Sequence, residues 1–289
     1  MTAVAGPRLG VNLPNFGPGT DRGMLAAWAR RVEDLGFGLL MTSDHLVVTE
    51  MVAEQYPAPF FEPLTTLAWL AGRTERLMLG TTVLVLPYRH PLQVARIAAN
   101  LAELSEGRFI LGVGVGWAAD EFAALGVEFA RRGAITDQYL AEIREAWARP
   151  DLAPGVPIWV GGNSAAAVRR AVRVGEAWHP IGLPLARLRR APATLEAAAR
   201  AEGRPVPQLA PRLNLRITPE PVTDVDRPAG TGSLEQVRAD LEEVARLGAV
   251  SIVFDTFTGR FEEIAHPDKA WDDLRSVAEL REELGWGSG

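Results

Sequence analysis

Residues 42–45 carry the first set of side chains suited to catalysis. They read Thr42-Ser43-Asp44-His45 and follow directly on a short apolar run. An imidazole beside a carboxylate can exchange a proton near neutral pH or orient a bound ligand. The same pair also fits a loop histidine that is held by the carboxylate of its neighbour. The sequence therefore gives Asp44 and His45 as candidate catalytic residues, with both interpretations open.

A glycine-rich turn at 158–164, with the sequence IWVGGNS, is a candidate anion site. Glycines let the backbone approach a ligand closely, and the unpaired N–H groups at a helix start attract a phosphate. The alternative is an ordinary tight turn in which Asn163 or Ser164 caps the following helix. We take Gly161, Gly162, Asn163 and Ser164 as candidate phosphate-binding residues.

Two further stretches are candidates for ligand contact. Residues 112–117 read GVGVGW, and alternating glycines on a strand indicate close approach of the backbone either to a flat ligand or to neighbouring side chains. Trp117 stands where a dinucleotide-binding G-x-G-x-x-G motif needs its last glycine, so this motif is absent. Residues 81–91 read TTVLVLPYRHP, and the YRH tripeptide at 88–90 fits either ligand contact or a structural corner.

The composition excludes several other kinds of chemistry. The 289 residues include no cysteine, which rules out disulfides, thiolate metal sites and a cysteine nucleophile. The four histidines lack the H-E-x-x-H spacing of a zinc site, so we expect no metal. A net charge of −6 argues against a nucleic-acid partner, which needs a basic face. With no signal peptide and no long apolar run, we expect a cytoplasmic protein without a membrane segment.

Short apolar runs alternate with amphipathic helical stretches along the whole chain, and this rhythm must position the candidate residues. The alternation predicts an α/β fold with a closed (β/α)8 TIM barrel, because each apolar run is followed by helical chain. One helix, after Ser233, starts with a capping box completed by Gln236. The eight expected strands are 8–13, 38–42, 77–86, 108–115, 157–160, 177–181, 212–217 and 249–254.

Long connections follow the second, fourth and sixth of these strands, at 43–63, 117–157 and 182–210. All three would lie at the carboxyl ends of the strands, where barrel enzymes build their sites from loops. No Gly/Ser-rich linker divides the sequence, so we expect a single barrel domain over 1–289 with insertions at these three positions.

Taken together, the motifs resemble the luciferase-like monooxygenase family, and within it the oxidoreductases that use the deazaflavin coenzyme F420. The strongest similarity lies in 81–140, where TTVLVLPYRHPLQVARIAANLAELSEGRFILGVGVGW is followed by DEFAALGVEFARRGAITDQYL. The segments 43–45 and 159–164 occur in the matching order. The resemblance covers nearly the whole chain and is weakest over 182–231.

This resemblance implies a cofactor ring across the ends of strands three and four. It implies a non-proline cis peptide at Thr82-Val83 that supports the ring, and a proton donor or acceptor at His45, oriented by Asp44. The turn at 161–164 would hold the cofactor phosphate. The implied cofactor-binding residues are Ser43, Asp44, His45, Thr82, Val83, Gly114, Gly116, Trp117, Gly161, Gly162, Asn163 and Ser164.

Two departures from the family pattern concern the substrate. The sugar-phosphate dehydrogenases of this group carry a Glu at the position of Trp117 and a Trp at that of Thr49, which argues against glucose 6-phosphate. A substrate pocket formed by Asn15, Phe16, Tyr56 and Trp117 favours a more apolar or aromatic compound.

The resemblance implies hydride transfer between coenzyme F420 and a small organic substrate. Deazaflavin carries carbon where flavin has its oxygen-reactive nitrogen, so it favours hydride chemistry over oxygen activation. The alternative is an FMN-dependent monooxygenase that uses reduced flavin and O2, and a second alternative is a flavin-binding barrel without catalysis. A homodimer is expected because dimers are usual in the family. The sequence names neither the substrate nor the direction of hydride transfer.

Overall fold

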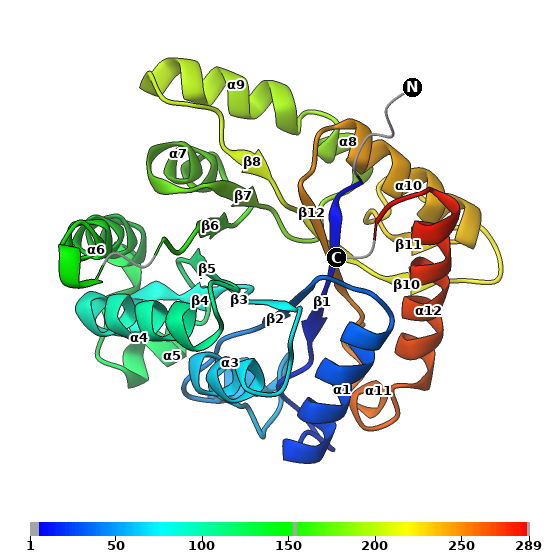
Figure 1. The fold of residues 1–289 in the computed structure, drawn as a ribbon, viewed down its shortest axis with the longest axis horizontal. Coiled ribbons are helices and arrows are strands. Elements are labelled where there is room, and N and C mark those ends of the chain that lie inside the picture. Colours follow the sequence, from blue (N-terminus) through cyan, green and yellow to red (C-terminus); the bar gives the residue numbers. More distant parts are fainter. Residues whose placement is uncertain (1–5, 153–154, 288–289) are drawn as a thin grey trace.

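A curled parallel sheet surrounded by helices forms the centre of the molecule (Figure 1). The computed structural model describes residues 6–152 and 155–287. Neighbouring strands follow the order β8-β7-β6-β5-β3-β2-β1-β12-β9, with β4 also on β5, and each pairing is parallel. The strands of this sheet are β1 (Arg8–Leu13), β2 (Leu39–Thr42), β3 (Met78–Thr81), β4 (Leu84–Val85), β5 (Phe109–Gly114), β6 (Ile158–Gly161), β7 (Ala177–His179), β8 (Gln208–Leu209), β9 (Arg212–Asn214) and β12 (Ser251–Asp255).

The sheet closes through a broken strand. β8 pairs with β7 while β9 pairs with β12, and only Ala210 and Pro211 separate β8 from β9 along the chain. Two backbone hydrogen bonds complete the junction: the N–H of Arg212 donates to Pro180 O at 2.8 Å, and the N–H of Gly182 donates to Arg212 O at 2.9 Å. β8 and β9 therefore act as the seventh of eight barrel strands. The prediction of a (β/α)8 barrel is confirmed.

Two of the expected strands are interrupted. The run 77–86 splits into β3 and β4 around a cis peptide at Thr82-Val83. Gly80 pairs with Ile110 and Leu84 with Val113, so four steps on one strand match three on the other. This is a β-bulge, which bends the strand end. The run 212–217 ends in the barrel at 214, and its last residues form β10 (Arg216–Ile217), which pairs with β11 (Thr231–Gly232) outside.

Helices cover the outside of the barrel, and several begin at capping side chains (Figure 1). Asp21 accepts a hydrogen bond from the Met24 N–H at the start of α1, and Ser233 with Gln236 forms the expected capping box of α10. The α-helices are α1 (Arg22–Asp34), α2 (Glu50–Ala53), α3 (Pro63–Ala71), α4 (Pro91–Leu104), α5 (Ala119–Ala124), α6 (Arg132–Trp147), α7 (Ala165–Val174), α8 (Leu185–Leu188), α9 (Ala191–Glu202), α10 (Leu234–Arg246), α11 (Glu262–Ala265) and α12 (Asp268–Glu283). Short 3-10 turns are η1 (Leu86–Tyr88), η2 (Phe129–Arg131) and η3 (Pro150–Leu152).

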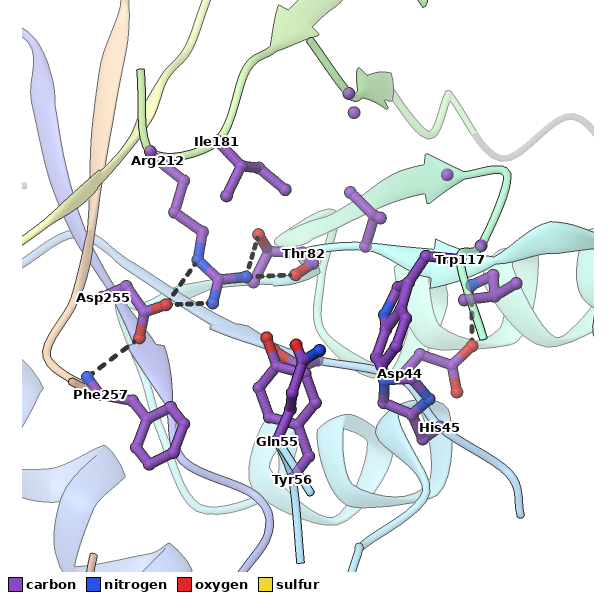
Figure 2. Close-up of a pocket in the computed structure, with 18 of the residues that line it drawn as sticks. Asp44, His45, Gln55, Tyr56, Thr82, Trp117, Ile181, Arg212, Asp255 and Phe257 are labelled. Atoms are coloured by element: carbon purple, nitrogen blue, oxygen red, sulfur yellow. Dashed lines mark hydrogen bonds and ion pairs between the residues drawn. The ribbon is translucent and has the colours of Figure 1, made fainter. Parts of the chain in front are cut away.

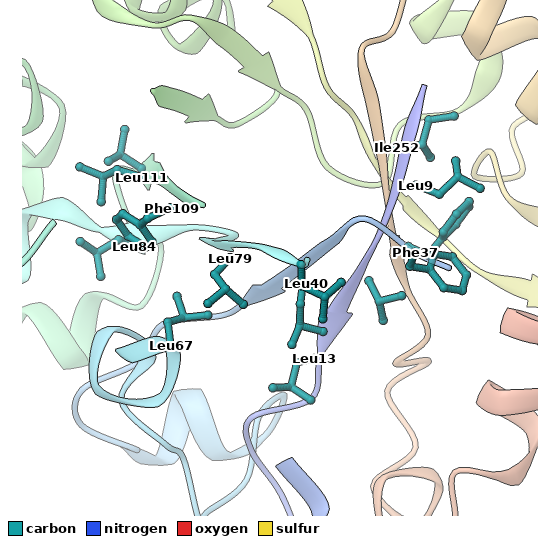
Figure 3. Packing of buried hydrophobic residues seen from close by; sticks show 14 of the residues in the cluster. Leu9, Leu13, Phe37, Leu40, Leu67, Leu79, Leu84, Phe109, Leu111 and Ile252 are labelled. Carbon is teal, nitrogen blue, oxygen red and sulfur yellow. The ribbon is translucent and has the colours of Figure 1, made fainter. Parts of the chain in front are cut away.

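Buried apolar residues form two layers because side chains alternate between the faces of a strand. Leu40 belongs to the layer between strands and helices, together with Leu9 and Leu79 (Figure 3). Its neighbours Leu39 and Met41 point into the barrel and pack in a second cluster. Each fully buried leucine contributes roughly 1.5–3 kcal/mol. These clusters leave the carboxyl ends of the strands for a ligand site.

The register of the strands brings the candidate residues to one level. Leu13 pairs with Thr42, and Thr42 pairs with Thr81. The residues that follow β2 and β3 therefore meet at the same end of the barrel. The expected long connections also lie there: α2 and α3 follow β2, α5 and α6 follow β5, and α8 and α9 follow β7. Within the described ranges, no helix has the length and apolar character needed to cross a membrane.

Candidate active site

A cavity of about 650 Å³ opens among the loops at the carboxyl ends of the strands (Figure 2). Two of the expected cofactor-binding residues, Asn163 and Ser164, are exposed and lie outside its lining. The expected residues on its wall are Ser43, Asp44, His45, Thr82, Val83, Gly114, Gly116, Trp117, Gly161 and Gly162. The cavity thus joins segments that are more than a hundred residues apart in the chain.

His45 is buried in the wall and is held by Glu121 of α5. Its Nδ1 lies 2.6 Å from Glu121 Oε2, and the other carboxylate oxygen accepts the N–H groups of Leu46 and Val47 at 2.6 and 3.0 Å. Burial alone would raise the pKa of Glu121, but these bonds, led by that from His45, bring it below its usual value. An ionised carboxylate can only accept, so Nδ1 carries the proton. Among the described residues, His45 Nε2 has no hydrogen-bond partner.

Tyr88 completes this wall cluster. Its hydroxyl donates to Glu121 Oε2 at 3.0 Å, and Glu121 itself has no exposed surface. Burial raises the pKa of the Tyr88 phenol above its usual value, and the Glu121 carboxylate adds to this effect. The carboxylate thus receives four hydrogen bonds, which offset the cost of burying its charge.

Asp44 does not orient His45, so this part of the sequence interpretation is wrong. Its carboxylate binds the guanidinium of Arg89 through two bonds of 2.6 and 2.8 Å and accepts the Val85 N–H at 2.8 Å. Arg89 also contacts Glu62 at 2.9 Å. Asp44 therefore ties the loop after β2 to the turn after β4. Arg89 of the YRH tripeptide occupies a structural corner rather than the cavity wall.

A second buried polar cluster forms the floor beneath the cavity. Arg212 donates to the carbonyl oxygen of Thr82 at 2.7 Å and forms an ion pair with Asp255 (Figure 2). The Thr82 hydroxyl lies 2.8 Å from His179 Nε2, and His179 Nδ1 bonds Ala210 O. Burial lowers the pKa of His179 to about 4. This cluster holds the segment around the cis peptide, and none of its members was singled out by sequence apart from Thr82.

The side chain of Val83 explains why positions 114 and 161 are glycines. A Cβ atom at Gly114 would lie 2.4 Å from Val83 Cγ2, and one at Gly161 would lie 2.6 Å from Val83 Cγ1. Both glycines therefore make room for the Val83 side chain, which is the packing alternative that the alternating pattern left open. Gly116 has a φ of +79° and lines the cavity beside Trp117.

The glycine-rich turn leads from β6 into α7. Gly162 has a φ of +109° and lines the cavity, while the Ser164 hydroxyl caps α7 by accepting the Ala167 N–H at 3.2 Å. The Asn163 side chain bridges to Ile181 through two bonds of 2.7 and 2.9 Å. Both side chains thus have structural partners, and the groups of the turn that remain suited to an anion are the backbone N–H groups at the start of α7.

Aromatic side chains form a further part of the cavity wall, from Trp117 beside His45 to Phe257 beside Asp255 (Figure 2). The Tyr56 ring stacks 5.4 Å from His45, and Trp117 meets His45 edge to face at 5.6 Å. Phe257, which sequence reasoning missed, lies 6.0 Å from Tyr56. Phe16 is buried behind Tyr56 at 5.0 Å and does not line the cavity.

Asn15 is likewise outside the lining, contrary to the expected substrate pocket. Its amide nitrogen donates to Ser43 O and Phe61 O at 2.9 and 2.7 Å, and its oxygen accepts the Ser43 N–H. Asn15 therefore fixes the start of the His45 loop. Phe16 supports Tyr56 from behind, so both residues shape the pocket indirectly.

The model of the family described as luciferase-like monooxygenase matches residues 8–221, which is most of the chain. The chain belongs to the luciferase-like monooxygenase family. The match includes β1 to β9 and the segments that carry His45, Glu121 and Gly162. The family is one of oxidoreductases, in agreement with the resemblance drawn from residues 81–140.

Relatives of this luciferase-like protein include an F420-dependent glucose-6-phosphate dehydrogenase of Microbacterium testaceum. The two are 33% identical over 189 residues, which are 56% of this chain and 52% of that protein, so the chain matches only about half of the relative's length. An F420-dependent secondary alcohol dehydrogenase in complex with an F420-acetone adduct superposes with a TM-score of 0.72 at 15% identity, covering 94% of this chain and 99% of that one. An FMN-bound type II Baeyer-Villiger monooxygenase of Pseudomonas putida gives 0.72 at 14% identity, covering 96% and 98%. These two structures establish the fold alone.

Most functional residues of this luciferase-like protein that were not predicted from the sequence are hydrogen-bond or ion-pair partners of the predicted cluster. Glu121 lies 76 positions after His45, and no local motif connects the two. Asp255 had a usable signal, because it ends strand β12 and site residues concentrate at the carboxyl ends of barrel strands, whereas Arg212 is the first residue of β9. Among the described residues, no three His, Asp or Glu side chains are placed to hold a metal ion.

Proposed function

We propose that this protein is an F420-dependent oxidoreductase that transfers a hydride between the deazaflavin and a small organic substrate. The observation that carries the proposal is the buried His45–Glu121 pair, which leaves His45 Nε2 free on the wall of a cofactor-sized cavity. F420-dependent relatives at 33% identity support this cofactor over FMN.

The cavity residues fit a cofactor of this kind. A volume of about 650 Å³ lies within the roughly 300–1,000 Å³ of small-molecule sites. Ser43, Val83 and Gly114 would contact the ring, and the backbone around Gly162 would hold the phosphate at the start of the ten-residue helix α7. Asn163 and Ser164 would act by fixing this turn. When bound, F420 supplies a ring carbon that accepts or donates a hydride.

His45 would exchange the proton that accompanies hydride transfer. With Nδ1–H donated to Glu121, Nε2 is the atom that gives a proton to a substrate carbonyl oxygen during reduction, or takes one from a hydroxyl during oxidation. The buried Glu121 carboxylate stabilises the imidazolium form and fixes the ring orientation, the role a carboxylate has beside a catalytic histidine. The aromatic rings of Tyr56 and Trp117 pack against the His45 imidazole and exclude water from that side of it.

The second candidate is an FMN-dependent monooxygenase, which the fold shared with the FMN-bound Baeyer-Villiger enzyme supports. Reduced flavin and O2 would use the same cavity. The His45–Glu121 pair would then serve as a proton source as well, so the site geometry does not decide between the cofactors.

A turnover assay separates the two. The purified protein would be incubated without oxygen with F420 and a panel of alcohols, or with reduced F420 and a panel of ketones, while the F420 absorbance is followed. We expect turnover that His45→Gln lowers by about 10²–10⁴-fold. Oxygen uptake with reduced FMN and no change in F420 would contradict the proposal and favour the monooxygenase.

A further inference from the structure

The charged side chains of the cavity wall offer no free positive charge to an anionic substrate. Arg212 is the one Arg or Lys side chain of the lining within the described residues, and Asp255 neutralises it in an ion pair. Asp44 is neutralised by Arg89, and the remaining carboxylate of the lining, Glu54, is exposed. A phosphate or carboxylate of the substrate would therefore find no unpaired Arg or Lys on this wall, the side chains that commonly bind such groups.

The same cavity wall offers aromatic faces. Trp117 is 39% exposed, and Tyr56 and Phe257 are half-buried, so parts of three rings remain open to the cavity. Phe16 packs against both Tyr56 and Phe257 at 5.0 and 5.1 Å and holds them in place. Rigid rings with open faces favour a flat apolar partner, since aromatic pairs gain energy beyond the area that they bury.

Polar atoms without a partner among the described residues lie near these rings, and two of them suit a neutral ligand oxygen. One is His45 Nε2, and the other is the hydroxyl oxygen of Tyr56, whose side chain lines the same cavity. Burial raises the pKa of the Tyr56 phenol, so its hydroxyl stays protonated at neutral pH. Both atoms suit a hydroxyl or carbonyl oxygen of a ligand, and neither requires a charged one.

We propose that the substrate is an uncharged aromatic alcohol or the corresponding ketone, with its ring among Tyr56, Trp117 and Phe257 and its oxygen at His45 Nε2. This inference rests on the proposed function. In reduction of the ketone, the imidazolium form of His45 would give the Nε2 proton to the carbonyl oxygen, and reduced F420 would supply the hydride to the carbonyl carbon. In oxidation of the alcohol, His45 Nε2 would take the hydroxyl proton and F420 would take the hydride.

Binding of matched ligands tests the inference without requiring turnover. Dissociation constants would be measured by calorimetry, with and without F420, for acetonaphthone, its ring-carboxylated analogue, cyclohexyl methyl ketone and glucose 6-phosphate. The variants would be Trp117→Ala and Phe257→Ala. Trp69→Ala is the matched control, because Trp69 is a half-buried tryptophan on α3 outside the cavity lining.

We expect acetonaphthone to bind at least about tenfold more tightly than its carboxylated analogue and glucose 6-phosphate. Trp117→Ala and Phe257→Ala should each weaken acetonaphthone binding by about three- to tenfold, while Trp69→Ala leaves it unchanged. Failure of acetonaphthone to bind, equal binding of the anions, or equal loss in the control would overturn the inference.

The same ligands distinguish the two proposals. If acetonaphthone binds as expected but F420 is not consumed, the aromatic site stands and the proposed function fails. If F420 is turned over with glucose 6-phosphate and not with the aromatic ketone, the proposed function stands and the substrate class is wrong.

Discussion

His45 and His179 are both buried next to the same cavity, yet their surroundings differ in one respect. His45 uses Nδ1 to bind Glu121 and leaves Nε2 without a partner among the described residues. His179 engages both nitrogens, one with Thr82 and one with Ala210. A histidine can exchange protons with a substrate only if one nitrogen is available, so the wall histidine suits catalysis and the floor histidine suits structure.

The largest expected effect comes from replacing the wall histidine. His45→Gln should lower kcat by about 10²–10⁴-fold, the usual contribution of a positioned acid or base, while F420 affinity changes little. Steady-state kinetics and a cofactor titration would measure both. A kcat within a few-fold of the wild type would show that the two histidines do not differ in the way proposed.

Glu121→Gln should lower kcat by about 10²-fold, because the neutral amide no longer stabilises an imidazolium at His45. The pH profile should change with it, which a purely structural loss would not cause. Two-dimensional ¹⁵N NMR of the imidazole rings would report the tautomer of His45, with His179 as the internal control. An unchanged His45 tautomer together with an unchanged pH profile would contradict the positioning role of Glu121.

His179, the histidine of the floor cluster, should affect how the stability of the protein depends on pH. Its folded pKa of about 4 lies below the ordinary 6.5, so between these values the unfolded chain binds a proton that the folded chain does not. The contribution of His179 to the free energy of unfolding is therefore fully present above pH 6.5 and falls by about 3 kcal/mol as the pH approaches 4. Urea unfolding at several pH values should show that His179→Gln removes this part of the loss. An identical acid loss in the variant would contradict the assignment.

The smallest effect concerns the turn before α7. Ser164→Ala should reduce the free energy of unfolding by about 1 kcal/mol through loss of the helix cap. Asp21→Ala removes the equivalent cap of α1, far from the turn, and should cost a similar amount. Only the Ser164 variant should also weaken F420 binding. Equal F420 affinity in the two variants would argue against a phosphate at this turn.

The barrel could be predicted from the sequence because each strand is a short apolar run with helical chain behind it. Arg8–Leu13 matches the expected strand in full. The break in 77–86 was not visible as a pattern, because residues on both sides of the bulge are apolar. The cis peptide at Thr82-Val83 was expected from the family resemblance and not from residue types.

The candidate site was predicted in part, for a physical reason. Side chains in a local motif, such as His45 or Gly162, can be read from neighbouring residues. Glu121 reaches His45 only because α5 packs beside the loop after β2, which is a tertiary contact. Asp44 was adjacent in sequence, but its carboxylate turns to Arg89, and adjacency gave the wrong partner.

The most direct test of the central proposal is a titration of the purified protein with F420 and, separately, with FMN, followed by cofactor fluorescence. We predict that F420 binds at least about tenfold more tightly than FMN. Tighter binding of FMN, or binding of neither cofactor, would contradict the assignment of this cavity to a deazaflavin.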